Sequence, residues 1–420
     1  MERIVERCAG LDVHKDLVVA CVHCPGEDGE RQSHTASFAT FTADLLALRD
    51  WLVSLGVTRV GMEATGVYWK PVFYVLEDLT ECWLLNARHM ANVPGRKTDV
   101  ADAEWITTLV EHGLVRPSFV PPPEVRDVRE LTRYRRTVLE ERSREAQRLD
   151  KVLQDAGIKL SSVASDVLGL SARRMLDALV AGTSDPAVLA ELAKGHLRKK
   201  LPALREALDA RFGRRHAVVV AEILGHLDYL DESVERLSGA IDEVMAPFAD
   251  ARDRLTTIPG VNRHLAESLI GEIGVDMSRF PSAAHLASWA GMCPGQHESA
   301  GKSKKGTARD GNSWIQRHLA LAAMAAARTK GTYLSSQYHR LAPRRGKRRA
   351  RKAVGHSILL AVWHILDVEG MTYEELGADW FERRNDPARR ARRKLAELRN
   401  LGCDLVANPD GTFTLAVPTA

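Results

Sequence analysis

Short apolar segments alternate with segments of helical periodicity from residue 5 to residue 113, and this alternation constrains the fold more than any other feature. The strand-like segments are bounded by turn residues and comprise residues 8–13, 17–23, 33–38, 57–62 and 81–85. The helical segments carry apolar residues at helical spacing and comprise residues 41–55, 66–76 and 98–110, with Thr98 as the N-cap of the last. Alternation of this kind predicts an α/β domain built on a mostly buried central sheet.

Prolines mark the end of this region, at Pro117 and at residues 121–123, and they predict a linker. The following residues, 125–156, are charged and helical, with apolar positions close to a heptad seam that Glu141 and Arg142 interrupt. Two interpretations fit this pattern equally well. The segment either forms a coiled coil that pairs subunits, or it is one long helix packed on its own domain.

The sequence divides into four parts, since composition and periodicity change at each boundary. These are an α/β domain over residues 1–115, a linker with a helical or coiled-coil region over 116–250, an all-α domain over 251–345, and a basic helical extension over 346–420. Within the extension we expect helices at residues 356–366, 372–381 and 386–400, followed by a small hairpin at 404–416.

Four acids stand where strands end or a helix begins. Asp12 ends the first strand, Glu63 ends the fourth, and Asp99 and Asp102 share one face of a helix start. Phosphodiester chemistry uses acids in this way, because two divalent cations about 4 Å apart activate the attacking oxygen and stabilise the leaving one. Oxygen ligands suit Mg²⁺ or Mn²⁺. The alternative is structural, since Asp12 could simply end a strand while Asp99 and Asp102 complement a helix dipole.

Positive charge is concentrated in one segment. Between Arg340 and Lys352 there are eight Lys or Arg and no acid, whereas the whole chain carries only +4. Such a block favours a polyanionic partner, although many charge runs are simply solvated surface. We name as candidate nucleic-acid contacts Arg344, Arg345, Lys347, Arg348 and Arg349.

A second group of cations precedes the paired acids Asp99 and Asp102. It comprises Arg88, Arg96 and Lys97, which suit a phosphate backbone beside a metal site or ordinary loop solvation.

The segment after Asp250 has the outline of a helix-hairpin-helix, because residues 258–261 place a Pro-Gly turn between two helical stretches. In such an element the turn at Gly260 and the next helix N-terminus can hold a phosphate, but a turn without a ligand has the same pattern. A glycine-flanked basic loop follows, with Ser299 and the candidate phosphate contacts Lys302, Lys304 and Lys305. Ser299 could attack a phosphate if its hydroxyl is activated, or it could be an ordinary loop serine.

Together these segments resemble the insertion-sequence transposases with a DEDD catalytic domain, which are related to the RuvC Holliday-junction resolvase. The N-terminal resemblance rests on GLDVHKD at residues 10–16, MEATG at 62–66 and KTDVADA at 97–103. The C-terminal resemblance rests on IPGV at 258–261, GEIG at 271–274, GMCP at 291–294, SAGK at 299–302 and GN at 311–312. The order and number of these motifs make the resemblance specific, and the segment at 373–381 is similar to the tail of longer members.

The resemblance implies a RuvC-like (RNase H-like) N-terminal domain in which Asp12, Glu63, Asp99 and Asp102 bind metal. It implies that Ser299 is the nucleophile, that the protein is linked covalently to DNA through a phosphoserine, and that the new strand's hydroxyl releases this link. It also implies donor and target DNA, a structured non-coding bridge RNA that pairs with both, and a homo-oligomer, dimer or tetramer. Our hypothesis is a divided site, in which metal at the acids activates Ser299.

Two other function classes share parts of this pattern. A metal-dependent nuclease or junction resolvase would keep the acids but use water in place of Ser299, and a non-catalytic nucleic-acid-binding protein would need neither. No apolar run is long enough to span a membrane, and the charged N-terminus lacks a signal core, so we expect a cytoplasmic protein.

Overall fold

The computed structural model describes most of the chain, in two compact units, Met1–Val120 and Pro121–Ala420. The described residues are 3–27, 29–64, 66–86, 90, 102–293, 298–299, 302–303, 311–384, 387–400, 404–407 and 413–416. Among the helices in these ranges, none is both long and apolar enough to cross a bilayer.

The N-terminal unit is built on one five-stranded mixed sheet, with strand order β3-β2-β1-β4-β5. Its described strands are β1 (Cys8–Val13), β2 (Leu17–Pro25), β3 (Arg31–Ala39), β4 (Arg59–Glu63) and β5 (Glu81–Leu85). Its described helices are α1 (Thr42–Ser54), α2 (Trp69–Leu76) and α4 (Asp102–Glu111). Strands β1 to β3 are antiparallel neighbours, whereas β4 runs parallel to both β1 and β5. The predicted α/β domain is confirmed, and the proposed cap at Thr98 lies outside the described residues.

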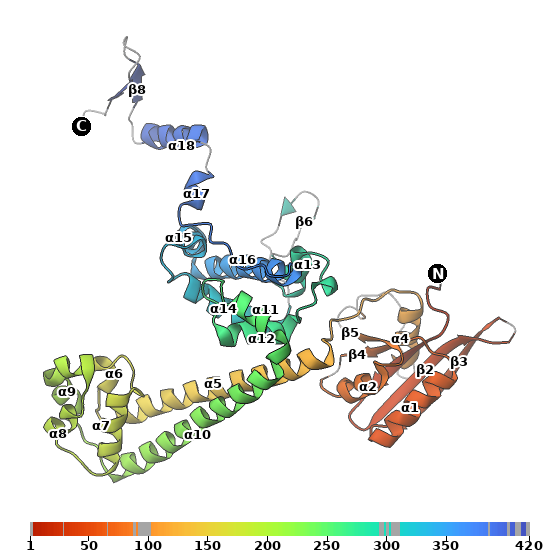
Figure 1. Cartoon of the computed structure of the whole chain (residues 1–420), viewed down its shortest axis with the longest axis horizontal. Coiled ribbons are helices and arrows are strands. Elements are labelled where there is room, and N and C mark those ends of the chain that lie inside the picture. The colour runs from red at the N-terminus through yellow and green to blue at the C-terminus, as the bar shows by residue number, and fades with distance from the viewer. Residues whose placement is uncertain are drawn as a thin grey trace. The chain divides into compact units, whose positions relative to one another are not determined.

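Helices cover both faces of this sheet (Figure 1). Helices α1 and α2 pack on one face, where Leu11 of β1 and Met62 of β4 are fully buried against Leu48 of α1. Helix α4 packs on the other face, where Ile106 lies near Cys8. Because side chains alternate along a strand, each strand of the parallel core supplies one set of residues to each layer.

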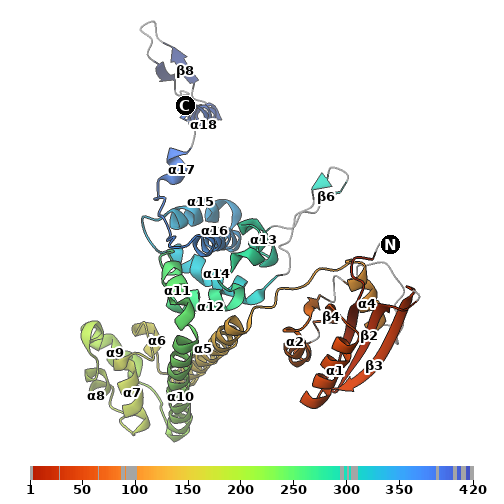
Figure 2. The same cartoon turned by 45° about the vertical axis from the view of Figure 1, so that its right-hand side comes forward.

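The C-terminal unit begins with two long helices, α5 (Pro123–Asp155) and α10 (Arg214–Val244), which lie side by side (Figures 1 and 2). They are antiparallel, since Arg135 contacts Ser238 whereas Arg142, further along α5, pairs with Asp231. Residues 125–156 lie in one long helix packed on its own unit, as the second interpretation predicted, and pairing of subunits through this helix stays untested.

A group of short helices fills the connection between α5 and α10. It comprises α6 (Leu160–Val163), α7 (Leu170–Val180), α8 (Pro186–Glu191), η1 (Gly195–Lys200) and α9 (Leu201–Leu208). Their apolar faces enclose a core with the adjoining ends of α5 and α10, including Leu153 and Leu224.

The rest of this unit is a helical cluster that continues from α10. Its members are η2 (Ala246–Phe248), α11 (Ala249–Leu255), α12 (Arg263–Ile273), η3 (Met277–Arg279), α13 (Ala283–Trp289), α14 (Ser313–Ala326), α15 (Tyr333–Arg345) and α16 (Lys347–Asp367). A two-stranded ladder, β6 (Glu298–Ser299) and β7 (Lys302–Ser303), lies between α13 and α14.

The extension contains α17 (Trp380–Arg383), α18 (Pro387–Asn400) and a hairpin of β8 (Asp404–Ala407) and β9 (Phe413–Ala416). The hairpin and the helix near 386–400 were predicted correctly, but the predicted helix at 372–381 is wrong, since only its last two residues are helical. Side chains satisfy this segment's backbone instead: Tyr373 N donates to Thr257 at 2.9 Å, and Gly377 N donates to Glu375 at 2.9 Å. Gly377 then adopts a φ of 84°, which a helix cannot contain.

Candidate active site

Asp12 and Glu63 occupy matching positions on neighbouring parallel strands. The register pairs Gly10 with Gly61 and Leu11 with Met62, so the next positions along β1 and β4 are the two acids. Both acids point to the face that α4 covers, because Leu11 and Met62 point to the α1–α2 core and side chains alternate. The strand ends therefore bring two carboxylates to one edge of the sheet.

Asp102 reaches the same edge because of how α4 lies on the sheet. Its early residues Ala103 and Thr107 lie over Gly10, whereas Glu111 at its end hydrogen-bonds His23 on the strand next to Cys8. Helix α4 therefore runs opposite to β1, and its first residue lies toward the end of the strand where Asp12 stands.

The chemistry of these donors fits a hard divalent cation. Asp12, Glu63 and Asp102 supply only carboxylate oxygens, which Mg²⁺ and Mn²⁺ accept. His14 is hydrogen-bonded to Asp12 at 3.0 Å. No three His, Cys, Asp or Glu of the described ranges stand in a metal-binding arrangement, and Asp99 lies outside those ranges.

The segment that carries Ser299 starts and ends at two glycines that touch. Gly311 lies so close to Gly291 and Ala290 that a Cβ on it would meet the Gly291 nitrogen at 2.4 Å. Gln316 of α14 also donates to the Ala290 carbonyl at 3.0 Å. Between these ends, the ladder of β6 and β7 pairs Ser299 with Lys302 in register.

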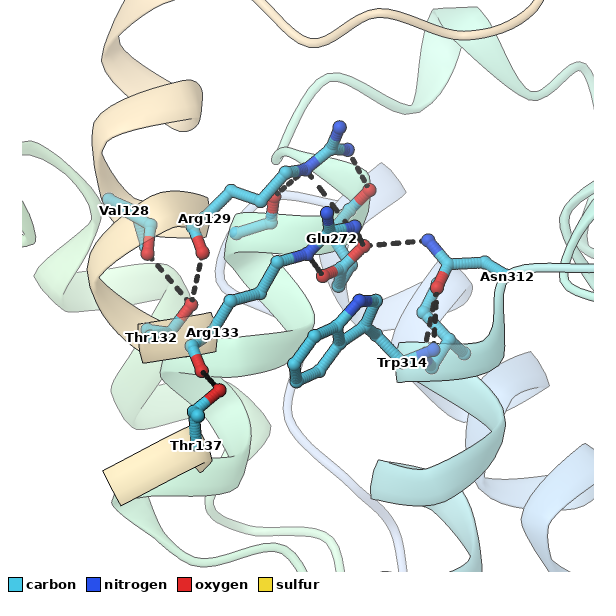
Figure 3. Close-up of polar contacts among 10 residues, drawn as sticks. Val128, Arg129, Thr132, Arg133, Thr137, Glu272, Asn312 and Trp314 are labelled. Carbon is cyan, nitrogen blue, oxygen red and sulfur yellow. Dashed lines mark hydrogen bonds and ion pairs between the residues drawn. The ribbon is translucent and has the colours of Figure 1, made fainter. Parts of the chain in front are cut away.

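A buried carboxylate, Glu272 of α12, fixes the C-terminal end of this segment (Figure 3). Asn312 donates to Glu272 at 2.6 Å, and it also caps α14 by accepting from the backbone of Trp314 at 2.9 Å. From α5, Arg133 donates to both carboxylate oxygens, at 2.6 and 2.8 Å. Arg129 donates to the Gly271 and Glu272 carbonyls and pairs with the Glu272 carboxylate. One side chain thus joins α5, α12 and α14.

Burial and pairing act in opposite directions on the pKa of Glu272. Burial is the largest influence and raises it, but the hydrogen bonds from Arg133 and Asn312 and the charges of Arg129 and Arg133 together outweigh it. The net effect lowers the pKa of Glu272 below its ordinary value, so the carboxylate is ionised at neutral pH.

Comparisons with known proteins find two family matches in this chain. A model of DEDD-type IS110 proteins, described as "Transposase", matches residues 9–158, and one described as "Transposase IS116/IS110/IS902 family" matches residues 252–340. The chain belongs to the IS110-type transposases. It is also 34% identical over 112 residues to the "Insertion element IS110 uncharacterized 43.6 kDa protein" of Streptomyces coelicolor. That match spans about a quarter of the relative's length, 26% of each chain.

The family match confirms the resemblance inferred from the motifs, and the structure describes many of the candidate residues of this chain. Those at the described sheet edge are Asp12, Glu63 and Asp102. Those outside the described residues are Asp99, Arg88, Arg96, Lys97, Lys304 and Lys305. Gly260 lies in the turn between α11 and α12, where its φ is 90° and its Cα faces the backbone of α14 at Ala322.

The sequence did not predict the contact between Glu272 and Asn312, or the part of Arg133 in it. Glu272 and Asn312 both stand in motifs that carry the family resemblance, and they form one hydrogen bond in the structure. Each is a polar residue that directly follows a glycine, and this was the signal in the sequence that could have pointed to them. No such signal marked Arg133, because nothing in the sequence distinguishes it from the other arginines of this charged helix.

Proposed function

We propose that the protein is a DNA transposase of an insertion element, which cuts and rejoins DNA through a covalent phosphoserine intermediate. The positions of Asp12 and Glu63 at the adjacent ends of β1 and β4, with α4 beginning toward the same edge, support this most directly, together with the two family matches. We also assign the N-terminal unit to the RuvC-like (RNase H-like) folds, and the α11–turn–α12 segment to helix-hairpin-helix-like elements.

In the proposed reaction, the Ser299 oxygen bonds to the scissile phosphorus while the bond from phosphorus to the leaving strand oxygen breaks. The serine loses its proton, and the leaving oxygen gains one. The hydroxyl of a new strand then bonds to the phosphorus and loses its proton, while the bond from phosphorus to the Ser299 oxygen breaks and this oxygen regains a proton. Asp12, Glu63, Asp99 and Asp102 would hold Mg²⁺ or Mn²⁺, which stabilises the charge that develops on the phosphate oxygens.

Replacement of Ser299 by alanine tests the nucleophile. The Ser299→Ala protein is expected to form no covalent adduct with DNA, because alanine has no oxygen to attack phosphorus. The adduct formed by the unmodified protein is trapped, digested and sequenced by mass spectrometry. Ser303→Ala, a serine four residues along, is the matched control and should retain adduct formation.

Two other results would replace this mechanism. Metal-dependent cleavage by Ser299→Ala without any adduct would favour a nuclease that uses water. Full activity of Asp12→Asn in the presence of Mg²⁺ would remove the acids from the mechanism, and DNA binding without cleavage by the unmodified protein would favour a non-catalytic protein.

We also propose that the junction of α15 and α16 contacts a guide RNA. Arg344, Arg345, Lys347, Arg348 and Arg349 are all exposed there, and none forms an ion pair with a carboxylate in the described ranges. The last three lie in the first turn of α16, where cations oppose the helix dipole. A bound phosphate backbone would offset this cost. We favour a structured bridge RNA that pairs with donor and target DNA, held by a dimer or tetramer.

Replacing these five cations by alanine is expected to weaken RNA binding and its dependence on salt. Each lost phosphate contact lowers the magnitude of the slope of log K against log salt by about 0.7 for single strands, so five lost contacts should lower it by roughly 3.5. Fluorescence anisotropy at several salt concentrations measures it, for RNA and for duplex DNA of equal length. Alanine at Lys194 and Lys199, exposed cations of the same unit, is the control; unchanged RNA binding by the five-residue variant would contradict the assignment.

A further inference from the structure

A cavity of about 440 Å³ opens within the C-terminal unit, between α5, α12 and α14, and we call it the His318 cavity. Its volume is within the range of small-molecule sites in proteins. Exposed side chains at its boundary, including His264, Leu321 and Ala325, leave it accessible from solvent. Neither the acids nor the Ser299 segment contributes to its lining.

The polar wall of the cavity contains a buried histidine. His318 is only 5% exposed, its ring stacks on Trp314 with the centroids 6.5 Å apart, and it contributes to the lining of the cavity. Burial lowers the pKa of His318 to about 4, so at neutral pH the imidazole offers one donor and one acceptor. A ligand with complementary groups in the cavity could hydrogen-bond to this imidazole.

The charges around the cavity are already balanced. Arg135 donates to Glu267 at 2.7 Å, and Arg136 donates to Glu140 at 3.0 Å. A free anion would therefore gain little attraction from these two arginines. The cavity instead suits an uncharged group with hydrogen-bonding atoms.

Much of the remaining wall is apolar, formed by Leu139, Leu265, Leu321 and Ala322, and Thr132 and Ser268 add two hydroxyl groups. A ligand that combines apolar flat faces with donors and acceptors at its edge matches this combination, and a nucleobase has that chemistry. At the mouth, the turn at Gly260 leads into α12, an 11-residue helix capped by Asn262. The first-turn amides of such a helix favour a phosphate.

We propose that the His318 cavity binds one unpaired nucleobase of the nucleic acid that the protein engages, with the adjoining phosphate at the N-terminus of α12. This rests on the proposed function only in taking nucleic acid as the partner. Binding a base that is unpaired would let the protein distinguish distorted duplexes from fully paired ones. The base could come from DNA or from RNA, which share this chemistry.

The test compares a fully paired duplex with one that contains a single unpaired 2-aminopurine, as deoxy and as ribo oligonucleotides, by anisotropy and 2-aminopurine fluorescence. The unmodified protein should prefer the unpaired duplex by about tenfold, the size of one base stacking on a protein surface. Ala325→Trp fills the cavity from an exposed position and should remove the preference while leaving affinity for the paired duplex unchanged. Val218→Trp, at an exposed position of α10 outside the cavity, should keep it.

A second variant guards against misfolding of the first. His318→Leu should lose most of the preference, and His318→Gln, which restores a donor and an acceptor, should recover part of it. The unmodified protein binding both duplexes equally, or Ala325→Trp retaining the preference, would overturn the proposal. A preference for the deoxy or the ribo oligonucleotide identifies whether the bound base comes from DNA or from RNA. Failure to find a serine adduct would leave this result standing, so the two proposals fail separately.

Discussion

The Gly10→Ala protein is expected to lose metal-dependent DNA cleavage by about 100-fold while remaining folded, since a displacement of about 1 Å near a reacting group has this effect. A Cβ on Gly10 would lie 2.3 Å from the Ala103 carbonyl oxygen and 2.4 Å from the Thr107 nitrogen. Both are backbone atoms of α4, so the helix must move away from the sheet by roughly 1 Å to restore ordinary contacts. Overpacking of this kind costs about 1–3 kcal/mol.

The substitution is expected to change the positions of the carboxylates more than the stability of the fold, because α4 carries Asp102 at its start and the strand beneath carries Asp12. Moving the helix separates carboxylates that come from different elements. Isothermal titration calorimetry with Mn²⁺ should show weaker binding, and a cleavage assay gives the loss of activity.

The matched control is Gly239→Ala in α10, where a Cβ meets nothing within 4 Å. This variant should keep full Mn²⁺ affinity and gain up to about 1 kcal/mol of stability, because alanine favours a helix over glycine. Gly10→Ala with unaltered Mn²⁺ affinity and cleavage would show that the close approach of α4 to β1 does not set the carboxylate positions.

The N-terminal fold could be predicted from the sequence because its signals are local. Segments such as residues 8–13 and 81–85 are strand-like by themselves, and the structure reproduces both as β1 and β5. The extension shows the limit of this approach. Residues 372–377 have helical composition, but hydrogen bonds from Tyr373 to Thr257 and from Gly377 to Glu375 hold them in an irregular conformation, and the Thr257 partner is distant in sequence.

In the candidate site, too, the local features could be predicted from the sequence and the long-range contacts could not. Acids at strand ends can be read from the sequence, and parallel pairing of β1 with β4 then brings Asp12 beside Glu63. The glycines opposite α4 could not be interpreted beforehand, since their need for space depends on which helix covers the sheet. The partner of Glu272 was equally hidden, because Arg133 is 139 residues away and one of many arginines in α5.

In the Glu272→Gln protein, the free energy of local unfolding of α12 and α14 is expected to fall by about 3 kcal/mol. Removing one partner of a buried ion pair leaves the other charge uncompensated, which costs about 3–5 kcal/mol, and the lower end applies because Arg133 is partly exposed. Hydrogen exchange of peptides from α12 and α14 measures this locally, which avoids assuming that the two units unfold together.

The pH dependence of this loss separates the charge of Glu272 from its packing. Since the pKa of Glu272 is lowered in the folded protein, its stabilisation is complete above the ordinary value of 4.5 and disappears as the pH falls through the lowered folded value. The difference between the unmodified protein and Glu272→Gln should therefore be constant near pH 7 and shrink below about pH 4.5. Glu140→Gln removes a partly exposed partner of Arg136 and should cost no more than about 0.5 kcal/mol at any pH. If Glu272→Gln behaved like Glu140→Gln, the junction of α5, α12 and α14 would be held by apolar packing, and the end of the Ser299 segment would not depend on this carboxylate.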